Sequence, residues 1–244
     1  DLHSFPTRRS SDLNLYAAKV RANKGTRKIV SDNNGVFVVK FIIILSLYYY
    51  LWEDKVADKD VIGKILYTDK EIQKKAKELG KQITKDYRGE ELILLGTLKG
   101  AILWMSELMK NIALDVKIDF ISASSYGSGT TSSGIVKIKK DISMDIYNKH
   151  VLIVEDIVDT GTTLKFLKDY LEDRNPKSVK VCTMLDKPSR RKNDIVAEYT
   201  GFSVEDLFVI GYGLDYDQKY RNLPYISYLE SEDITEVEIG RASC

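Results

Sequence analysis

The sequence has little cysteine, almost no net charge and no internal repeat. Its two cysteines are Cys182, which lies in an apolar run, and Cys244, which is the last of the 244 residues. A disulfide framework is therefore not expected, and we expect a cytoplasmic location because the cytoplasm is reducing. The formal net charge is only +1, so bulk charge does not indicate a nucleic-acid partner. The length suits one domain of ordinary size with an appendage.

The first 55 residues differ in character from the rest. Residues 1–34 are rich in Arg, Lys, Ser and Asn, and residues 1–13 resemble translated sequencing-adapter sequence, as do residues 240–244. Residues 36–52 then form an apolar run whose only charge is Lys40, near the short limit for a membrane-spanning helix. We interpret residues 1–55 as extraneous sequence translated from a wrong start, and we expect no membrane attachment. A signal anchor, an organellar presequence and an extra helix are the alternatives.

The most informative stretch is residues 151–164, VLIVEDIVDTGTTL. Four apolar residues predict a buried strand, and the acids Glu155 and Asp156 follow them directly. A third acid, Asp159, precedes a run that opens a helix: Thr160, Gly161, Thr162 and Thr163. Open α/β sheets bind ligands at the carboxyl ends of their strands, and the N–H groups of a helix N-terminus form a cradle for a phosphate. The acid pair can accept hydrogen bonds from a sugar diol or lie near a cation.

Strand and helix patterns alternate along the rest of the chain. Thr68 and Glu71 have the spacing of a helix-capping box. Further strands are expected at residues 91–96, 116–122, 135–138, 179–185 and 206–211, a helix through Trp104 and Met109, and a polar loop at residues 124–134. This order predicts an α/β fold with a mostly parallel twisted sheet, helices on both faces and a small hood. The domain is expected at residues 56–236, with residues 237–244 as a tail.

The stretch 151–164 resembles the phosphoribosyl-pyrophosphate motif of the type I phosphoribosyltransferases. Its variant, VEDIVDTGTT, is similar to the 6-oxopurine branch, the hypoxanthine-guanine phosphoribosyltransferases, and the short C-terminus is similar to the bacterial members. The resemblance covers about residues 56–232. It implies that Glu155 and Asp156 hold the ribose hydroxyls, that residues 160–163 hold the 5′-phosphate, and that Asp159 is the acid/base near purine N7.

Two motifs before this stretch match the same family. Leu98, Lys99 and Gly100 resemble the pyrophosphate-binding loop, in which the Leu–Lys peptide is cis or strained and turns N–H groups toward the pyrophosphate. Ser125 and Tyr126 resemble the start of a flexible loop that closes over the site and excludes water.

Three motifs after it also match. Lys187 is implied to bind O6 of the purine, although Asp186 precedes it where human-type members have an apolar residue. Phe208 is implied to stack on the base, and the Val209 backbone to meet the edge of the base. Asp215 is implied beside the purine at the magnesium–pyrophosphate position, with Arg221 reaching the pyrophosphate.

The resemblance implies a purine salvage enzyme that makes IMP or GMP and pyrophosphate from phosphoribosyl pyrophosphate and hypoxanthine or guanine. Mg²⁺ is the expected cofactor, near Glu155, Asp156 and Asp215, because the charge of the leaving group must be neutralised. The expected partners are small-molecule substrates and further copies of the chain, as a homodimer or homotetramer. One alternative is a regulator of the same fold that senses phosphoribosyl pyrophosphate, which would need a basic face or a DNA-binding domain. Another is a transferase that uses xanthine or uracil.

Overall fold

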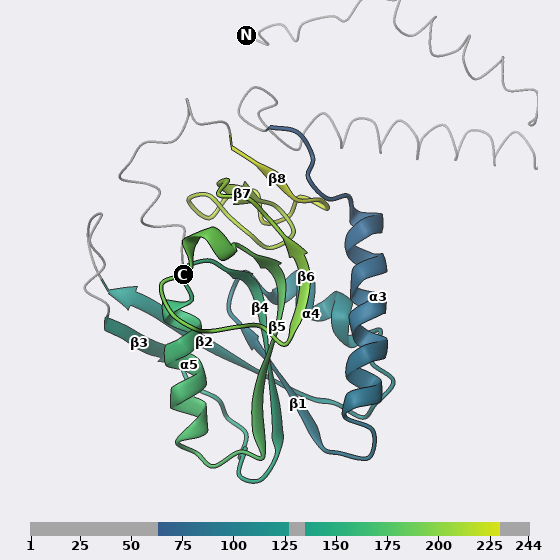
Figure 1. Cartoon of the computed structure of the whole chain (residues 1–244), viewed down its shortest axis with the longest axis vertical. Helices are drawn as coiled ribbons and strands as arrows, with labels where there is room; N and C mark the ends of the chain where they lie inside the picture. Colours follow the sequence, from purple (N-terminus) through teal and green to yellow (C-terminus); the bar gives the residue numbers. More distant parts are fainter. Residues whose placement is uncertain (1–62, 127–134, 230–244) are drawn as a thin grey trace, which may run out of the picture. The chain divides into compact units, whose positions relative to one another are not determined.

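The computed structural model describes residues 63–126 and 135–229 (Figure 1). The predictions made for residues 1–55 and 237–244 lie outside these ranges, so the domain bounds remain predictions. Within the described ranges, no helix is both long enough and apolar enough to cross a membrane.

The core of the fold is a six-stranded sheet with the strand order β3-β2-β1-β4-β5-β6. Its strands are β1 (Leu92–Thr97), β2 (Lys117–Tyr126), β3 (Ile135–Lys140), β4 (His150–Val158), β5 (Ser178–Asp186) and β6 (Tyr199–Ser203). In the spatial order β2-β1-β4-β5-β6, each strand pairs in parallel with the next. At one edge of the sheet, β3 pairs antiparallel with β2. The predicted mostly parallel sheet is confirmed.

Helices cover both faces of the sheet (Figure 1). Along β1 and β4, alternate side chains enter two separate apolar clusters: Leu94 and Leu152 in one, Ile93 and Val151 in the other. The first cluster includes residues of α3 (Asp69–Asp86) and α4 (Ile102–Met109), and the second includes residues of α5 (Thr162–Glu172). This alternation follows from the two-residue period of a strand that is buried on both faces.

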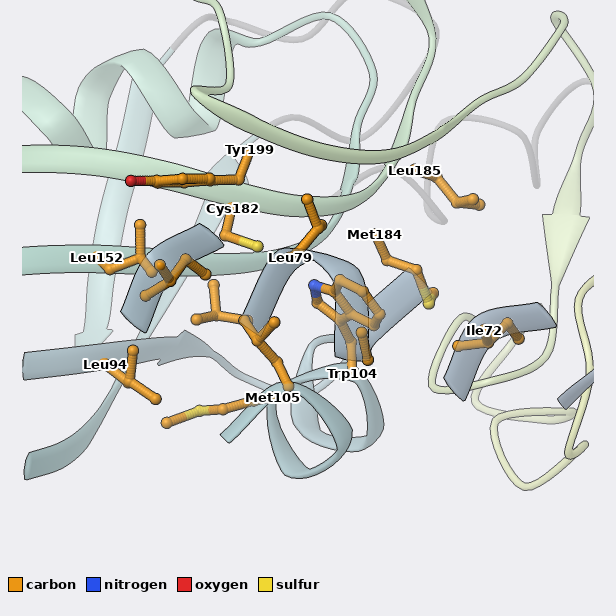
Figure 2. Packing of buried hydrophobic residues seen from close by; sticks show 14 of the residues in the cluster. Ile72, Leu79, Leu94, Trp104, Met105, Leu152, Cys182, Met184, Leu185 and Tyr199 are labelled. Atoms are coloured by element: carbon orange, nitrogen blue, oxygen red, sulfur yellow. The ribbon is translucent and has the colours of Figure 1, made fainter. Parts of the chain in front are cut away.

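The first cluster centres on Trp104, which has no exposed surface (Figure 2). The buried thiol of Cys182 belongs to the same cluster, and burial raises its pKa to about 12. Helix α3, which covers this cluster, begins at the predicted capping box, in which the Thr68 N–H donates to Glu71 Oε2 at 2.8 Å. The local start signal and the apolar face of α3 therefore agree.

Three sequence-based expectations were wrong. Residues 206–211 do not form a strand of the main sheet. Only β7 (Val209–Ile210) forms there, and it pairs antiparallel with β8 (Ser227–Tyr228) in a separate two-stranded sheet. This small sheet forms the predicted hood. Strand β6 was not predicted, and residues 124–126 are not loop but the end of β2.

Candidate active site

A cavity of about 320 Å³ lies at the carboxyl ends of β1, β4 and β5. Most residues singled out in the sequence line it: Leu98, Lys99, Gly100, Glu155, Asp156, Asp159, Thr163, Lys187, Phe208, Val209, Asp215 and Arg221. Thr160, Gly161 and Thr162 belong to the adjoining loop. Ser125 and Tyr126 lie on β2, paired with Val136 and Ile135, so they do not begin a loop as expected.

The acid pair lies within β4, which continues past it to Val158 because β5 stays paired alongside. Glu155 is buried, and Thr97 Oγ1 donates to its Oε1 at 2.7 Å. Burial, followed by the negative charge of Asp156, raises the pKa of Glu155 well above its usual value. Burial also raises the pKa of Asp156, whose Oδ1 accepts from the Ile157 N–H at 2.9 Å. Burial of Glu155 and its contact with a second carboxyl thus disfavour its charged form, and the oxygens of both side chains can hydrogen-bond with hydroxyl groups.

The predicted pyrophosphate loop lies against this pair. The Leu98–Lys99 peptide bond is cis, as the resemblance implies. A methyl group placed on Gly213, whose φ is +104°, would lie 2.0 Å from the Gly100 carbonyl oxygen. The side chain of Lys99 reaches outward, where its Nζ donates to Gln218 Oε1 at 2.9 Å. Glycines thus allow two loops to meet at the cavity wall.

Asp215 and Arg221 form an ion pair on this side of the cavity. Arg221 Nη2 lies 2.7 Å from Asp215 Oδ1, and Arg221 Nη1 donates to the Gly213 carbonyl oxygen at 2.7 Å. The Gln218 N–H donates to Asp215 Oδ2 at 2.7 Å. Arg221 Nε is buried and has no partner among the described residues. These contacts hold the guanidinium in place, and its Nε–H donor is left without a partner among the described residues.

The Thr160–Thr163 loop opens α5 at the other end of the cavity. Gly161 is the N-cap of the helix with φ +79°, a left-handed conformation that suits glycine. The Thr160 hydroxyl accepts from the Thr162 N–H at 3.4 Å, and its carbonyl oxygen accepts from the Lys192 N–H at 3.0 Å. The helix N-terminus and its threonine hydroxyls offer donors to an anion.

Lys187 lies at the third side of the cavity and is only 6% exposed. Its Nζ donates to the Leu207 carbonyl oxygen, and Asp206 Oδ1 lies 3.9 Å away. Burial lowers the pKa of Lys187. An ammonium has three donors, so donors remain for a ligand. The neighbouring ring of Phe208 is half-buried and contacts the Tyr216 ring edge-on at 5.5 Å between centroids.

Asp186 stands where human-type members of the family have an apolar residue, and its contacts explain how this site accommodates an acid. Its carboxylate forms an ion pair with Arg191, and Asp186 does not line the cavity. The Arg191 side chain in turn lies against the Thr160–Thr163 loop. A methyl group placed on Gly161 would lie 3.1 Å from Arg191 Cδ. Asp186 thus supports the Thr160–Thr163 loop through Arg191, while Lys187 still lines the cavity.

Among the cavity residues to which the sequence analysis gave no role, three contact residues that it did assign: Thr97, Arg190 and Gln218. Gln218 lies between Asp215 and Arg221 in the sequence but had no assigned role. Thr97 precedes the Leu-Lys-Gly motif, and its importance depends on β1 lying beside β4. Arg190, in the short 3₁₀ helix η2 (Pro188–Arg190), contacts Asp159, which no local pattern could reveal.

The donor set fits a magnesium ion that arrives with a diphosphate. In the described part of the chain, no group of three or more His, Cys, Asp or Glu side chains could hold a metal ion. Glu155 and Asp156 are adjacent, whereas Asp215 is engaged by Arg221. Mg²⁺ usually keeps several waters and binds through one or two carboxylates plus substrate phosphates. The residues present meet that lower requirement.

Comparisons with known proteins agree with this geometry. Residues 63–217 match the family model described as phosphoribosyl transferase domain. Hypoxanthine-guanine phosphoribosyltransferase of Streptococcus pneumoniae is 52% identical over 171 residues, which cover 70% of this chain and 95% of that protein. The namesake enzyme of Staphylococcus aureus is also 52% identical, over 70% of this chain and 96% of its own length.

Solved structures show the same fold. A hypoxanthine phosphoribosyltransferase from Staphylococcus aureus superposes with a TM-score of 0.70 at 49% identity, over 72% of this chain and 96% of that one. A hypoxanthine-guanine phosphoribosyltransferase from Bacillus anthracis has a TM-score of 0.67 at 49% identity, over 69% and 99%. The chain therefore belongs to the phosphoribosyltransferase family, in its hypoxanthine-guanine branch.

Proposed function

We propose that this chain transfers the 5-phosphoribosyl group of phosphoribosyl pyrophosphate to hypoxanthine or guanine, giving IMP or GMP and pyrophosphate. The observation that carries the proposal is the composition of one cavity. Two loops suited to anions, an acid pair of which Glu155 is buried, and a buried lysine line the same space. These are the groups needed for a phosphate, a pyrophosphate, a ribose diol and a 6-oxopurine, respectively.

Different groups of the cavity bind the different parts of phosphoribosyl pyrophosphate. The 5′-phosphate binds the N-terminus of α5 with the hydroxyls of the Thr160–Thr163 loop. Glu155 and Asp156 accept hydrogen bonds from the ribose diol. The pyrophosphate meets the backbone of Lys99 and Gly100, and Arg221 lines the same cavity. Fixing the sugar at both ends aligns its C1 with the base.

The bond from ribose C1 to pyrophosphate breaks as the bond to purine N9 forms, through an oxocarbenium-like state. Glu155, Asp156 and Asp215 would lie near a bound Mg²⁺, which would supply neutralising charge to the pyrophosphate. Arg221 adds a fixed positive charge on the same side, so the leaving group departs as a stabilised anion. As N9 bonds to ribose C1, the purine loses the proton on N7, and Asp159 accepts it.

The purine lies between Phe208 and the sugar, with Lys187 opposite O6. The Lys187 ammonium makes a charge-assisted hydrogen bond with a carbonyl oxygen. The Val209 backbone meets the other edge of the base. Ser125 and Tyr126 lie at the end of β2, and the expected closing loop that would follow them falls on residues 127–134, outside the described residues.

Two variants test the assignment of the acids. Asp159→Asn keeps the shape of the side chain but cannot take a proton, so turnover should fall by about 10²–10⁴-fold with little change in phosphoribosyl-pyrophosphate binding. The double variant Glu155→Gln, Asp156→Asn should instead chiefly weaken phosphoribosyl-pyrophosphate binding, measured by titration calorimetry with Mg²⁺. Parental turnover in the first, or parental affinity in the second, would refute the corresponding role.

We also propose that the enzyme acts in the cytoplasm as a homodimer or homotetramer. Ile102 and Met109 of α4 and Ile118 of β2 are 48%, 36% and 42% exposed, and an interface with a second copy would remove such apolar surface from water. The buried free thiol of Cys182 suits a reducing compartment. Sedimentation equilibrium and cell fractionation test these two proposals, and a monomer or a membrane-bound protein would overturn them.

A further inference from the structure

Arg190 connects the catalytic acid to the outer rim of the cavity. It lines the cavity from η2, and its Nε lies 3.0 Å from Asp159 Oδ1. On the other side, its Nη1 donates to Asp206 Oδ1 at 3.3 Å. The guanidinium thus bridges one carboxylate inside the cavity and another that is 57% exposed.

Asp159 Oδ1 has no other support. The atom is buried and accepts no hydrogen bond from any described residue, so the contact with Arg190 is a close charge contact without hydrogen-bond alignment. A buried carboxylate oxygen that accepts no hydrogen bond from a donor is costly in free energy. Lys187 is the other cation that interacts with Asp159, and its Nζ is already bound to the Leu207 carbonyl oxygen. Arg190 is therefore the main stabiliser of this carboxylate.

We infer that Arg190 is a positioning residue that holds the Asp159 carboxylate oriented toward the purine, while Asp206 fixes Arg190 from outside. Arg190 contacts Asp159 Oδ1, so Oδ2 is the oxygen that accepts the purine proton. The inference rests on the proposed function, because it assumes the acid/base role of Asp159. It adds a residue to the reaction that acts through another side chain.

Steady-state kinetics of the full chain test this inference. Arg190→Met should lower kcat by about 10- to 100-fold, because misplacing a reacting group by about 1 Å can cost that much. KM for phosphoribosyl pyrophosphate should stay within about twofold, since Arg190 lies at the purine end. Arg190→Lys keeps the charge and should restore part of kcat. Arg174→Met is the matched control: Arg174 is 34% exposed against 36% for Arg190, and it pairs with Asp141 away from the cavity.

A double-variant cycle separates this inference from the proposed function. On an Asp159→Asn background, Arg190→Met should cause almost no further loss, since there is no carboxylate left to orient. If Asp159→Asn is impaired but Arg190→Met has the parental kcat, or if the two losses multiply, the inference is wrong and the function stands. If Asp159→Asn turns over normally, the acid/base role fails and the inference falls with it. Should Arg190→Met not fold, Asp206→Asn replaces it in the cycle, with a smaller expected loss and the same criterion.

Discussion

The backbone of Gly100 touches the carboxylate of Asp156. A methyl group placed on Gly100 would lie 1.5 Å from Asp156 Oδ2 and 2.5 Å from its Cγ. The pyrophosphate loop and the acid pair, which are distant in the sequence, are therefore in contact at the floor of the cavity. Glycine is required at position 100 because the carboxylate occupies the space of a side chain.

Gly100→Ala should damage binding more than folding. The new methyl group must displace Asp156 or the loop, so KM for phosphoribosyl pyrophosphate should rise about tenfold or more. Gly89→Ala is a suitable control, because φ +82° strains alanine there but nothing lies within 4 Å. That variant should lose about 1–2 kcal/mol of stability and keep its KM. A Gly100→Ala enzyme with the parental KM would show that the contact does not matter for binding.

Lys187→Met should narrow the preference for 6-oxopurines over adenine. In the proposed function the buried ammonium would pair with O6 of hypoxanthine or guanine, whereas it would face another donor at the 6-amino group of adenine. Sites that hydrogen-bond a required group can reject the wrong analogue by about 10⁴-fold. The measurement is kcat/KM with hypoxanthine, guanine and adenine in parent and variant. An unchanged hypoxanthine-to-adenine ratio would mean that Lys187 does not select the base.

Asp119→Asn should reduce stability in a manner that depends on pH. Burial alone would raise the pKa of Asp119, but N–H donors from Phe120, Ser143 and Met144 outweigh it and lower the pKa to about 2. Since the folded pKa lies below the ordinary value of 3.8, the stabilisation is full above about pH 4 and is lost as the pH falls through about 2.

Urea unfolding of parent and variant at several pH values measures this effect. The parent should be more stable by about 1–2 kcal/mol near neutral pH, and the difference should shrink between pH 4 and pH 2. A difference that stays constant over that range would contradict an ionic role for Asp119. Asp145→Asn serves as a control, because Asp145 is an exposed acid that accepts from the Tyr147 N–H.

Local signals were enough to predict much of the fold. The capping box at Thr68 and the apolar runs of β1 and β4 are readable because each element is buried in a regular pattern. Strand β6 was missed because its sequence, YTGFS, mixes polar residues with a glycine on an edge strand. Residues 124–126 join β2 only through pairing with β3, and such long-range pairing leaves no local pattern.

Many residues that line the cavity could be singled out from the sequence, but not the contacts between them. The motif at residues 151–164 indicated the acids and the phosphate loop, and the cavity contains those acids together with Thr163. The contacts of Thr97 with Glu155 and of Arg190 with Asp159 depend on how strands and loops come together. Buried polar contacts of this kind follow from tertiary structure, which the spacing of residues does not encode.

Turnover of single purine bases by the purified chain tests the central claim most directly. The chain would be incubated with phosphoribosyl pyrophosphate and, in turn, hypoxanthine, guanine, xanthine or adenine, with and without Mg²⁺, and nucleotide and pyrophosphate would be quantified. We expect IMP from hypoxanthine and GMP from guanine, with one pyrophosphate per nucleotide, dependence on Mg²⁺ and almost no product from adenine. Failure to convert either hypoxanthine or guanine, or conversion of adenine at a similar rate, would contradict the account.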